Sequence, residues 1–123
     1  MRLSRRAALA MPSLALPAMA PPKAALAQAF PNRPLSLVVP YGAGSSTDIL
    51  GRVLAPPMSQ QLGQPVVVEN RVGAGGTVGM GHVARSAPDG HTMVLTSASA
   101  GPVNRALFRN LNFDPVRDLS LVY

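Results

Sequence analysis

A glycine-rich turn followed by hydroxyl groups and an aspartate is the segment of this chain best suited to bind a ligand. Gly42 and Gly44 let the backbone turn tightly and approach a ligand closely. The hydroxyl side chains that follow can cap a helix, and Asp48 suits a first helical turn. Such a turn directs free backbone N–H groups at one point, which makes an anion site. The sequence therefore predicts that a small carboxylate binds at Tyr41, Gly42, Ala43, Gly44, Ser45, Ser46, Thr47 and Asp48.

The elements on either side of this turn have to position it. Residues 35–39 form a short aliphatic run typical of a strand buried on both faces, and Pro40 ends it. A helix is expected from about residue 47 to residue 62, with Gly63 just after its end. Pro56 and Pro57 predict a kink or two short helices. The expected apolar stripe of this helix comprises Ile49, Leu50, Val53, Leu54, Met58 and Leu62.

Further strands and helices alternate along the rest of the chain. Strands are expected at residues 65–70 and 91–96, and short helices at residues 79–86 and 104–108. This alternation indicates an α/β fold with a mostly parallel sheet. The turns at residues 41–48, 71–79 and 97–104 then lie at the carboxyl ends of strands, where open α/β sheets bind ligands. Of these, the glycine turn at residues 73–79 is interpreted mainly as a tight junction between strand and helix.

The first 27 residues have the organisation of a signal peptide. Arg2, Arg5 and Arg6 precede an apolar stretch, and Ala25-Leu-Ala27 provides a small-x-small cleavage site. We expect cleavage after Ala27 and export to the periplasm. Ordinary secretion is favoured, and the twin-arginine route and an uncleaved membrane anchor stay open as alternatives.

Composition excludes several classes of function. The chain has 123 residues and a formal charge of +6, which falls to +2 without the four basic residues of the leader. Its remaining arginines are scattered and aromatic residues are few, so nucleic acid is not an expected partner. The absence of cysteine excludes disulfides and thiolate metal sites. A mildly basic surface does suit a small anionic ligand.

Enzymatic and cofactor motifs are incomplete. Neither glycine turn completes the Gly-x-Gly-x-x-Gly pattern of dinucleotide sites, and no lysine follows Lys23 to complete a phosphate loop. Ser46 lacks the second glycine of a nucleophile elbow, and His82 and His91 show no metal-ligand spacing. We therefore expect a binding protein with no catalytic residue, metal or cofactor. The alternative is a fragment of a hydrolase-like or nucleotide-binding α/β enzyme.

Four motifs resemble those of a known family and occur in its order and at its spacing. They are Pro31-x-Arg-Pro-Leu-x-Leu-Val-Val-Pro-Tyr-x-Ala-Gly-x-x-x-Asp48, Leu62-Gly-Gln-Pro-Val-Val-Val-Glu-Asn-Arg-x-Gly-Ala-Gly-Gly76, Ala87-Pro-Asp-Gly-His-Thr92 and Phe113-Asp-Pro-Val-Arg-Asp118. The pattern resembles the Bug-type substrate-binding proteins of tripartite tricarboxylate transporters. This resemblance implies a type II periplasmic-binding-protein-like fold of two lobes that close on a small organic carboxylate. It also implies partners in the membrane components of such a transporter.

The resemblance further implies how the chain is divided and which other residues face the ligand. Residues 28–118 would form the N-terminal part of the first lobe, and residues 119–123 would begin a crossover strand. The second lobe would be incomplete, so that a truncated chain would bind weakly or not at all by itself. The loop after the third strand would contribute Ser97, Ala98 and Ser99 to the ligand cleft.

Overall fold

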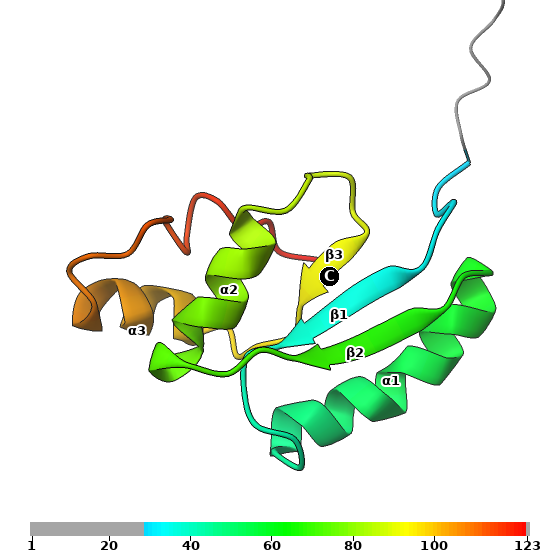
Figure 1. Cartoon of the computed structure of the whole chain (residues 1–123), viewed down its shortest axis with the longest axis horizontal. Helices are drawn as coiled ribbons and strands as arrows, with labels where there is room; N and C mark the ends of the chain where they lie inside the picture. The colour runs from blue at the N-terminus through cyan, green and yellow to red at the C-terminus, as the bar shows by residue number, and fades with distance from the viewer. Residues whose placement is uncertain (1–28, 123) are drawn as a thin grey trace, which may run out of the picture.

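The computed structural model describes residues 29–122, which build a three-stranded parallel sheet. The central strand is β1 (Leu35–Val39), with β2 (Val66–Asn70) on one side and β3 (Thr92–Val94) on the other (Figure 1). Leu37 lies opposite both Val68 and Met93 in the register. The predicted α/β class with a parallel sheet is thereby confirmed. The expected signal peptide, residues 1–27, lies outside the described residues.

Helices cover both faces of the sheet. Helix α1 (Ser46–Leu62) packs on one face, while α2 (Thr77–Ala84) and α3 (Ala100–Leu107) lie on the opposite side (Figure 1). A one-turn helix, η1 (Ala74–Gly76), precedes α2. The core accordingly has two apolar clusters. The cluster under α1 is built on Leu35, Leu37, Ala55 and Val66, and the cluster under α2 and α3 is built on Met80, Ala100 and Phe113.

Helix α1 begins and ends as its capping residues predict. Ser45 is the N-cap, and its hydroxyl accepts a hydrogen bond from the Asp48 amide. Gly63 ends the helix with a left-handed backbone at φ 68°. Of the two outcomes predicted at Pro56 and Pro57, the division into two helices is wrong, because α1 runs through both prolines as one element. Both prolines are exposed, so the helical carbonyl groups left without a donor can bind water.

The buried face of α1 is narrower than predicted. Ile49, Leu50, Val53 and Leu54 are exposed, whereas Met58 and Leu62 pack against the core. The residues that face the sheet are small, because α1 lies close to it. A Cβ on Gly51 would stand 3.4 Å from the side chains of Leu95 and Val39. The predicted apolar stripe was therefore correct in the C-terminal half of α1 and wrong in its N-terminal half.

The remaining boundaries differ by a few residues from expectation. Strand β3 is shorter than predicted, and α3 begins four residues before the expected start at residue 104. Residues 119–122 form neither helix nor strand, so the expected strand start is not seen in them. Among residues 29–122, no helix is both long and apolar enough to span a bilayer.

Candidate functional site

Three strand-to-helix turns meet at one edge of the sheet, where all three parallel strands end (Figure 1). The Tyr41 hydroxyl lies 3.2 Å from the Thr96 hydroxyl and so joins the first turn to the third. The Asn70 amide donates to the Tyr41 carbonyl over 3.1 Å, which joins the first turn to the end of β2. Asn104 in α3 donates to the Gly75 carbonyl over 3.1 Å. These bonds hold the three turns together as one surface.

The first turn presents free donors at the start of a long helix. The Ser45 amide donates to the Gly42 carbonyl over 3.1 Å, and the Ser45 hydroxyl accepts a hydrogen bond from the Asp48 amide. Within residues 29–122, the amides of Ser46 and Thr47 have no hydrogen-bond acceptor. As the first residues of the 17-residue α1, they stand at the positive end of its dipole. This geometry can bind an anion without any charged side chain.

The glycines of the first turn stand in open space. A Cβ on Gly42 or on Gly44 would meet no atom within 4 Å, and Gly44 has a positive φ of 83°. Gly42, Ala43 and Gly44 are all exposed, as is Ser46. The predicted residues therefore lie together on an accessible surface, and their contact with a ligand stays a prediction.

Asp48 differs from the other predicted residues because it faces inward. It is buried, and its carboxylate accepts hydrogen bonds from the Gly44 amide at 2.8 Å, Arg52 Nε at 3.0 Å and Asn70 Nδ2 at 2.9 Å. Chiefly the Arg52 hydrogen bond, followed by the Gly44 and Asn70 bonds, lowers the pKa of Asp48 to about 2. Asp48 is therefore ionised at neutral pH, with its charge directed at protein donors.

The third loop brings its predicted residues to the same edge. Ser97, Ala98 and Ser99 are exposed, and the hydroxyls of the two serines lie 3.4 Å apart. Ser99 occupies the N-cap position of α3 but makes no side-chain capping bond there. Both hydroxyls consequently remain accessible to a ligand above this edge.

The second glycine turn has a different role. A Cβ on Gly79 would stand 2.8 Å from the Arg71 carbonyl oxygen and 2.9 Å from Pro40 Cβ. A Cβ on Gly76 would stand 3.3 Å from the same proline atom. These glycines let α2 pack closely against the end of β1. The interpretation of residues 73–79 as a tight junction agrees with this packing.

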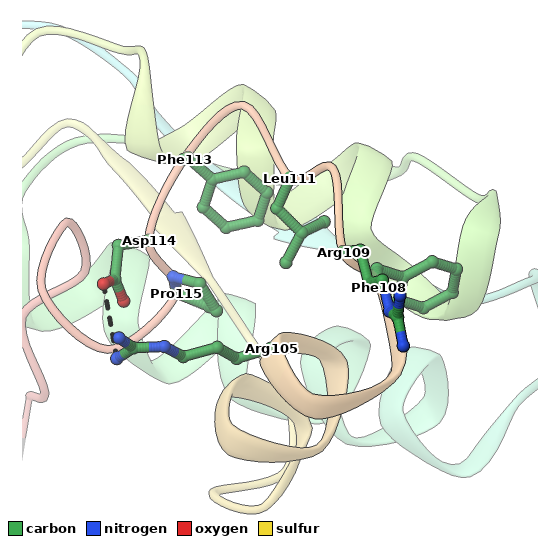
Figure 2. Close-up of a pocket in the computed structure, with 7 residues that line it drawn as sticks. All are labelled: Arg105, Phe108, Arg109, Leu111, Phe113, Asp114 and Pro115. Atoms are coloured by element: carbon green, nitrogen blue, oxygen red, sulfur yellow. Dashed lines mark ion pairs between the residues drawn. The ribbon is translucent and has the colours of Figure 1, made fainter.

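A separate groove of about 500 Å³ lies between α3 and the segment that follows it (Figure 2). Figure 2 shows Arg105 directed toward Asp114, with an ion pair of 3.3 Å between them. Phe113 and Leu111 line the groove, and none of the predicted ligand-binding residues does. Arg109 also lines the groove, beside the Arg105–Asp114 pair. In the described part of the chain, no three His, Cys, Asp or Glu side chains are grouped to hold a metal ion.

Sequence reasoning missed four polar residues that organise this edge: Arg52, Asn70, Thr96 and Asn104. The four-residue spacing of Asp48 and Arg52 on a helix was a usable signal for the first of them. Asn70 and Thr96 follow or end strands that run to the same edge, which also could have marked them. Asn104 gave no such signal, because α3 was expected to begin at residue 104 and begins at Ala100.

Comparison with known proteins decides the family. The sequence profile of the tripartite tricarboxylate transporter family receptor matches residues 50–123. The chain belongs to this family. Its members are solute-binding receptors and not enzymes. The alternative of an enzyme fragment is therefore wrong, and the geometry agrees, since His91 precedes β3 and Ser46 follows β1 at opposite edges of the sheet.

Individual relatives agree with this assignment. This chain is 45% identical to the protein BugT of Bordetella pertussis over 94 residues, which cover 76% of this chain and 29% of BugT. The periplasmic binding protein BugD is 51% identical, with a TM-score of 0.51 over 53% of this chain and 22% of BugD.

Two ligand-bound structures are also similar. MatC from Rhodopseudomonas palustris with bound malate is 40% identical, with a TM-score of 0.67 over 72% of this chain and 30% of MatC. An R. palustris protein with adipate is 34% identical, with a TM-score of 0.66 over 71% of this chain and 29% of that protein. This chain thus spans less than a third of the length of BugT, MatC and the adipate-bound protein.

Proposed function

We propose that this chain forms the N-terminal part of the first lobe of an extracytoplasmic receptor that captures a small organic dicarboxylate. The first turn, residues 41–48, would hold one carboxylate group of the ligand. The third loop, with Ser97, Ala98 and Ser99, would border the same ligand. The captured acid would then be delivered to the membrane components of a tripartite tricarboxylate transporter.

One observation supports this proposal above all others. The amides of Ser46 and Thr47 are unpaired within the described residues, at the positive end of α1 and beside glycines that leave open space. Backbone donors of this kind suit a carboxylate because they need no desolvated cation as partner. The exposed hydroxyls of the third loop supply further donors along the same edge.

The relatives narrow the chemical class. Malate and adipate, the ligands of the two similar R. palustris structures, are both dicarboxylates but differ in length. Because a single turn can hold one carboxylate of either acid, we assign recognition of length to other parts of a complete receptor. A lobe by itself encloses one end of the ligand, so the affinity of this chain is expected to be weak. Export to the periplasm would follow from the leader at residues 1–27.

A thermal-shift panel tests this function. The full chain is heated with millimolar malate, adipate, citrate, ATP or NAD, because a ligand that binds the folded state raises the melting temperature. We expect the carboxylates to raise it and the two nucleotides to leave it unchanged. Stabilisation by ATP or NAD alone, or by no carboxylate in the panel, would contradict the proposal.

A further inference from the structure

A buried polar cluster ties the first turn to two elements of the fold. The Asp48 side chain is 3% exposed, and its three hydrogen-bond donors come from different segments: the turn itself, α1 and β2. Asn70 at the end of β2 extends the cluster, since its amide nitrogen also donates to the Tyr41 carbonyl at 3.1 Å. Arg52 closes it by donating to Asn70 Oδ1 over 3.1 Å. The first turn is thus anchored at Tyr41 and at Gly44.

We infer that Asp48, Arg52 and Asn70 are positioning residues. They hold residues 41–45 of the first turn in the binding conformation before a ligand is present. This inference rests on the proposed function for its effect on affinity, but the shape of the turn can be measured without ligand. In this arrangement the Gly44 amide points inward to Asp48, and the amides of Ser46 and Thr47 remain for the ligand. Holding a binding loop in place in advance raises affinity because less freedom is lost on binding.

The cluster has a matched pattern of donors and acceptors that an isosteric substitution breaks. Asp48 Oδ2 accepts from Gly44 and Arg52, while Oδ1 accepts from Asn70. Asparagine at position 48 would place an NH₂ group against one of these donors. Asn70 cannot turn its amide over to compensate, because its nitrogen also serves Tyr41 and its oxygen serves Arg52. Asp48→Asn therefore loses at least one anchor of the turn.

The direction in which Asp48→Asn changes carboxylate affinity separates a positioning role from a simple effect of charge. Asp48 is an anion close to the proposed anion site, so its removal by Asp48→Asn would strengthen carboxylate binding if charge alone mattered. Loss of positioning predicts the opposite, a weaker complex. We expect a decrease in affinity of about tenfold, the size of one buried hydrogen bond left unmade.

Asp89 provides a control carboxylate at the other edge of the sheet. It accepts from the His91 amide at 3.0 Å and pairs with Arg33 at 2.7 Å, just before β3 and β1 begin. The His91 amide bond, followed by the Arg33 bond, lowers the pKa of Asp89 to about 2, as for Asp48. Asp89→Asn therefore removes an ionised, hydrogen-bonded carboxylate, 43% exposed against 3% for Asp48, without touching the ligand edge.

The experiment compares the full chain with Asp48→Asn, Asp89→Asn and Arg52→Met by amide NMR, with malate as the probe. We expect either the Gly44 backbone amide or the Asn70 side-chain amide, whichever faces the new NH₂ group, to lose its downfield shift in Asp48→Asn and not in Asp89→Asn. Malate affinity, read from the Ser46 and Thr47 amides, should fall about tenfold in Asp48→Asn, and by less than twofold in Asp89→Asn. Arg52→Met, which removes a partly exposed donor, should give a smaller loss of about threefold and serves if Asp48→Asn does not fold.

The outcomes distinguish this inference from the proposed function. Equal or tighter malate binding by Asp48→Asn, or Gly44 and Asn70 amides that are both unchanged, would overturn the positioning role. If the parent chain binds no carboxylate, the proposed function fails, and the Gly44 and Asn70 amides still decide whether the cluster holds the turn. Loss of affinity in Asp89→Asn equal to that in Asp48→Asn would show a general loss of stability and would also overturn the inference.

Discussion

The two glycine turns of this chain are similar in composition and opposite in use. In the first turn, Gly42 and Gly44 have no atom within 4 Å of the position where a Cβ would stand. In the second, Gly79 would bring a Cβ within 2.8 Å of a backbone oxygen. The first turn uses glycine to leave space at an exposed edge, and the second uses it to bring α2 onto β1. A glycine-rich motif therefore identifies a ligand site only where the surrounding space is open.

The largest effect that separates the two turns should be on stability. Gly79→Ala forces a Cβ against the Arg71 carbonyl oxygen and Pro40, and we expect the free energy of unfolding to fall by about 2–3 kcal/mol. Gly42→Ala, the matched change in the first turn, should alter it by less than about 0.5 kcal/mol. Urea denaturation measures both. Equal unfolding midpoints for the two variants would remove the distinction between the turns.

The next effect should be on binding and confined to the first turn. Gly42→Val fills the open space with a side chain on a backbone that has no positive φ. We expect malate affinity to fall about tenfold, because the ligand loses one or two contacts with the turn. Calorimetry or NMR titration provides the measurement. Unchanged affinity would place the ligand elsewhere than the first turn.

Gly44 and Gly63 form a matched pair that sharpens the comparison further. They begin and end the same helical unit, both have positive φ (83° and 68°), and neither has an atom near the position of a Cβ. Alanine at either position should lower the free energy of unfolding by about 1 kcal/mol through backbone strain alone. Only Gly44→Ala should also weaken malate binding. A binding defect in Gly63→Ala would mean that strain in α1, and not the turn, governs affinity.

The smallest expected effect is a difference in pH response. The pKa of Asp48 in the folded chain, about 2, lies below its ordinary value of 3.8. Its contribution to stability is therefore present above about pH 4 and is lost as pH falls through about 2. The Gly44 amide signal should change over this interval, whereas the amide of Gly76, which donates to the Gly73 carbonyl, should not. A Gly44 signal that stays constant over this range would contradict the Asp48 contact.

Local chemistry was sufficient to predict the elements around the site. The bounds of β1 follow from its aliphatic run and Pro40, and the ends of α1 follow from Ser45 and Gly63. The sequence was less informative about features that depend on how closely two elements pack. The face of α1 could not be assigned from hydrophobicity, because the helix approaches the sheet through Gly51 and Ala55 and leaves larger apolar side chains outside.

The structure brings the predicted site residues together, and their contact with a ligand stays a prediction. The sequence placed residues 41–48 and 97–99 at the same edge of the sheet, and the structure brings them together there. It could not reveal that Asp48 turns inward, because that orientation depends on Asn70, which is 22 residues away in the chain. The difference between a ligand-facing and a structural carboxylate is a property of the packed fold and not of the motif.

A malate titration of the full chain, followed residue by residue through its backbone amides, tests the central claim most directly. We predict saturable shifts at Ser46 and Thr47, with no change at Gly75 and Gly76 in the second turn. Saturable shifts confined to the second turn or to the groove between Arg105 and Pro115 would contradict the account, as would the absence of any saturable shift.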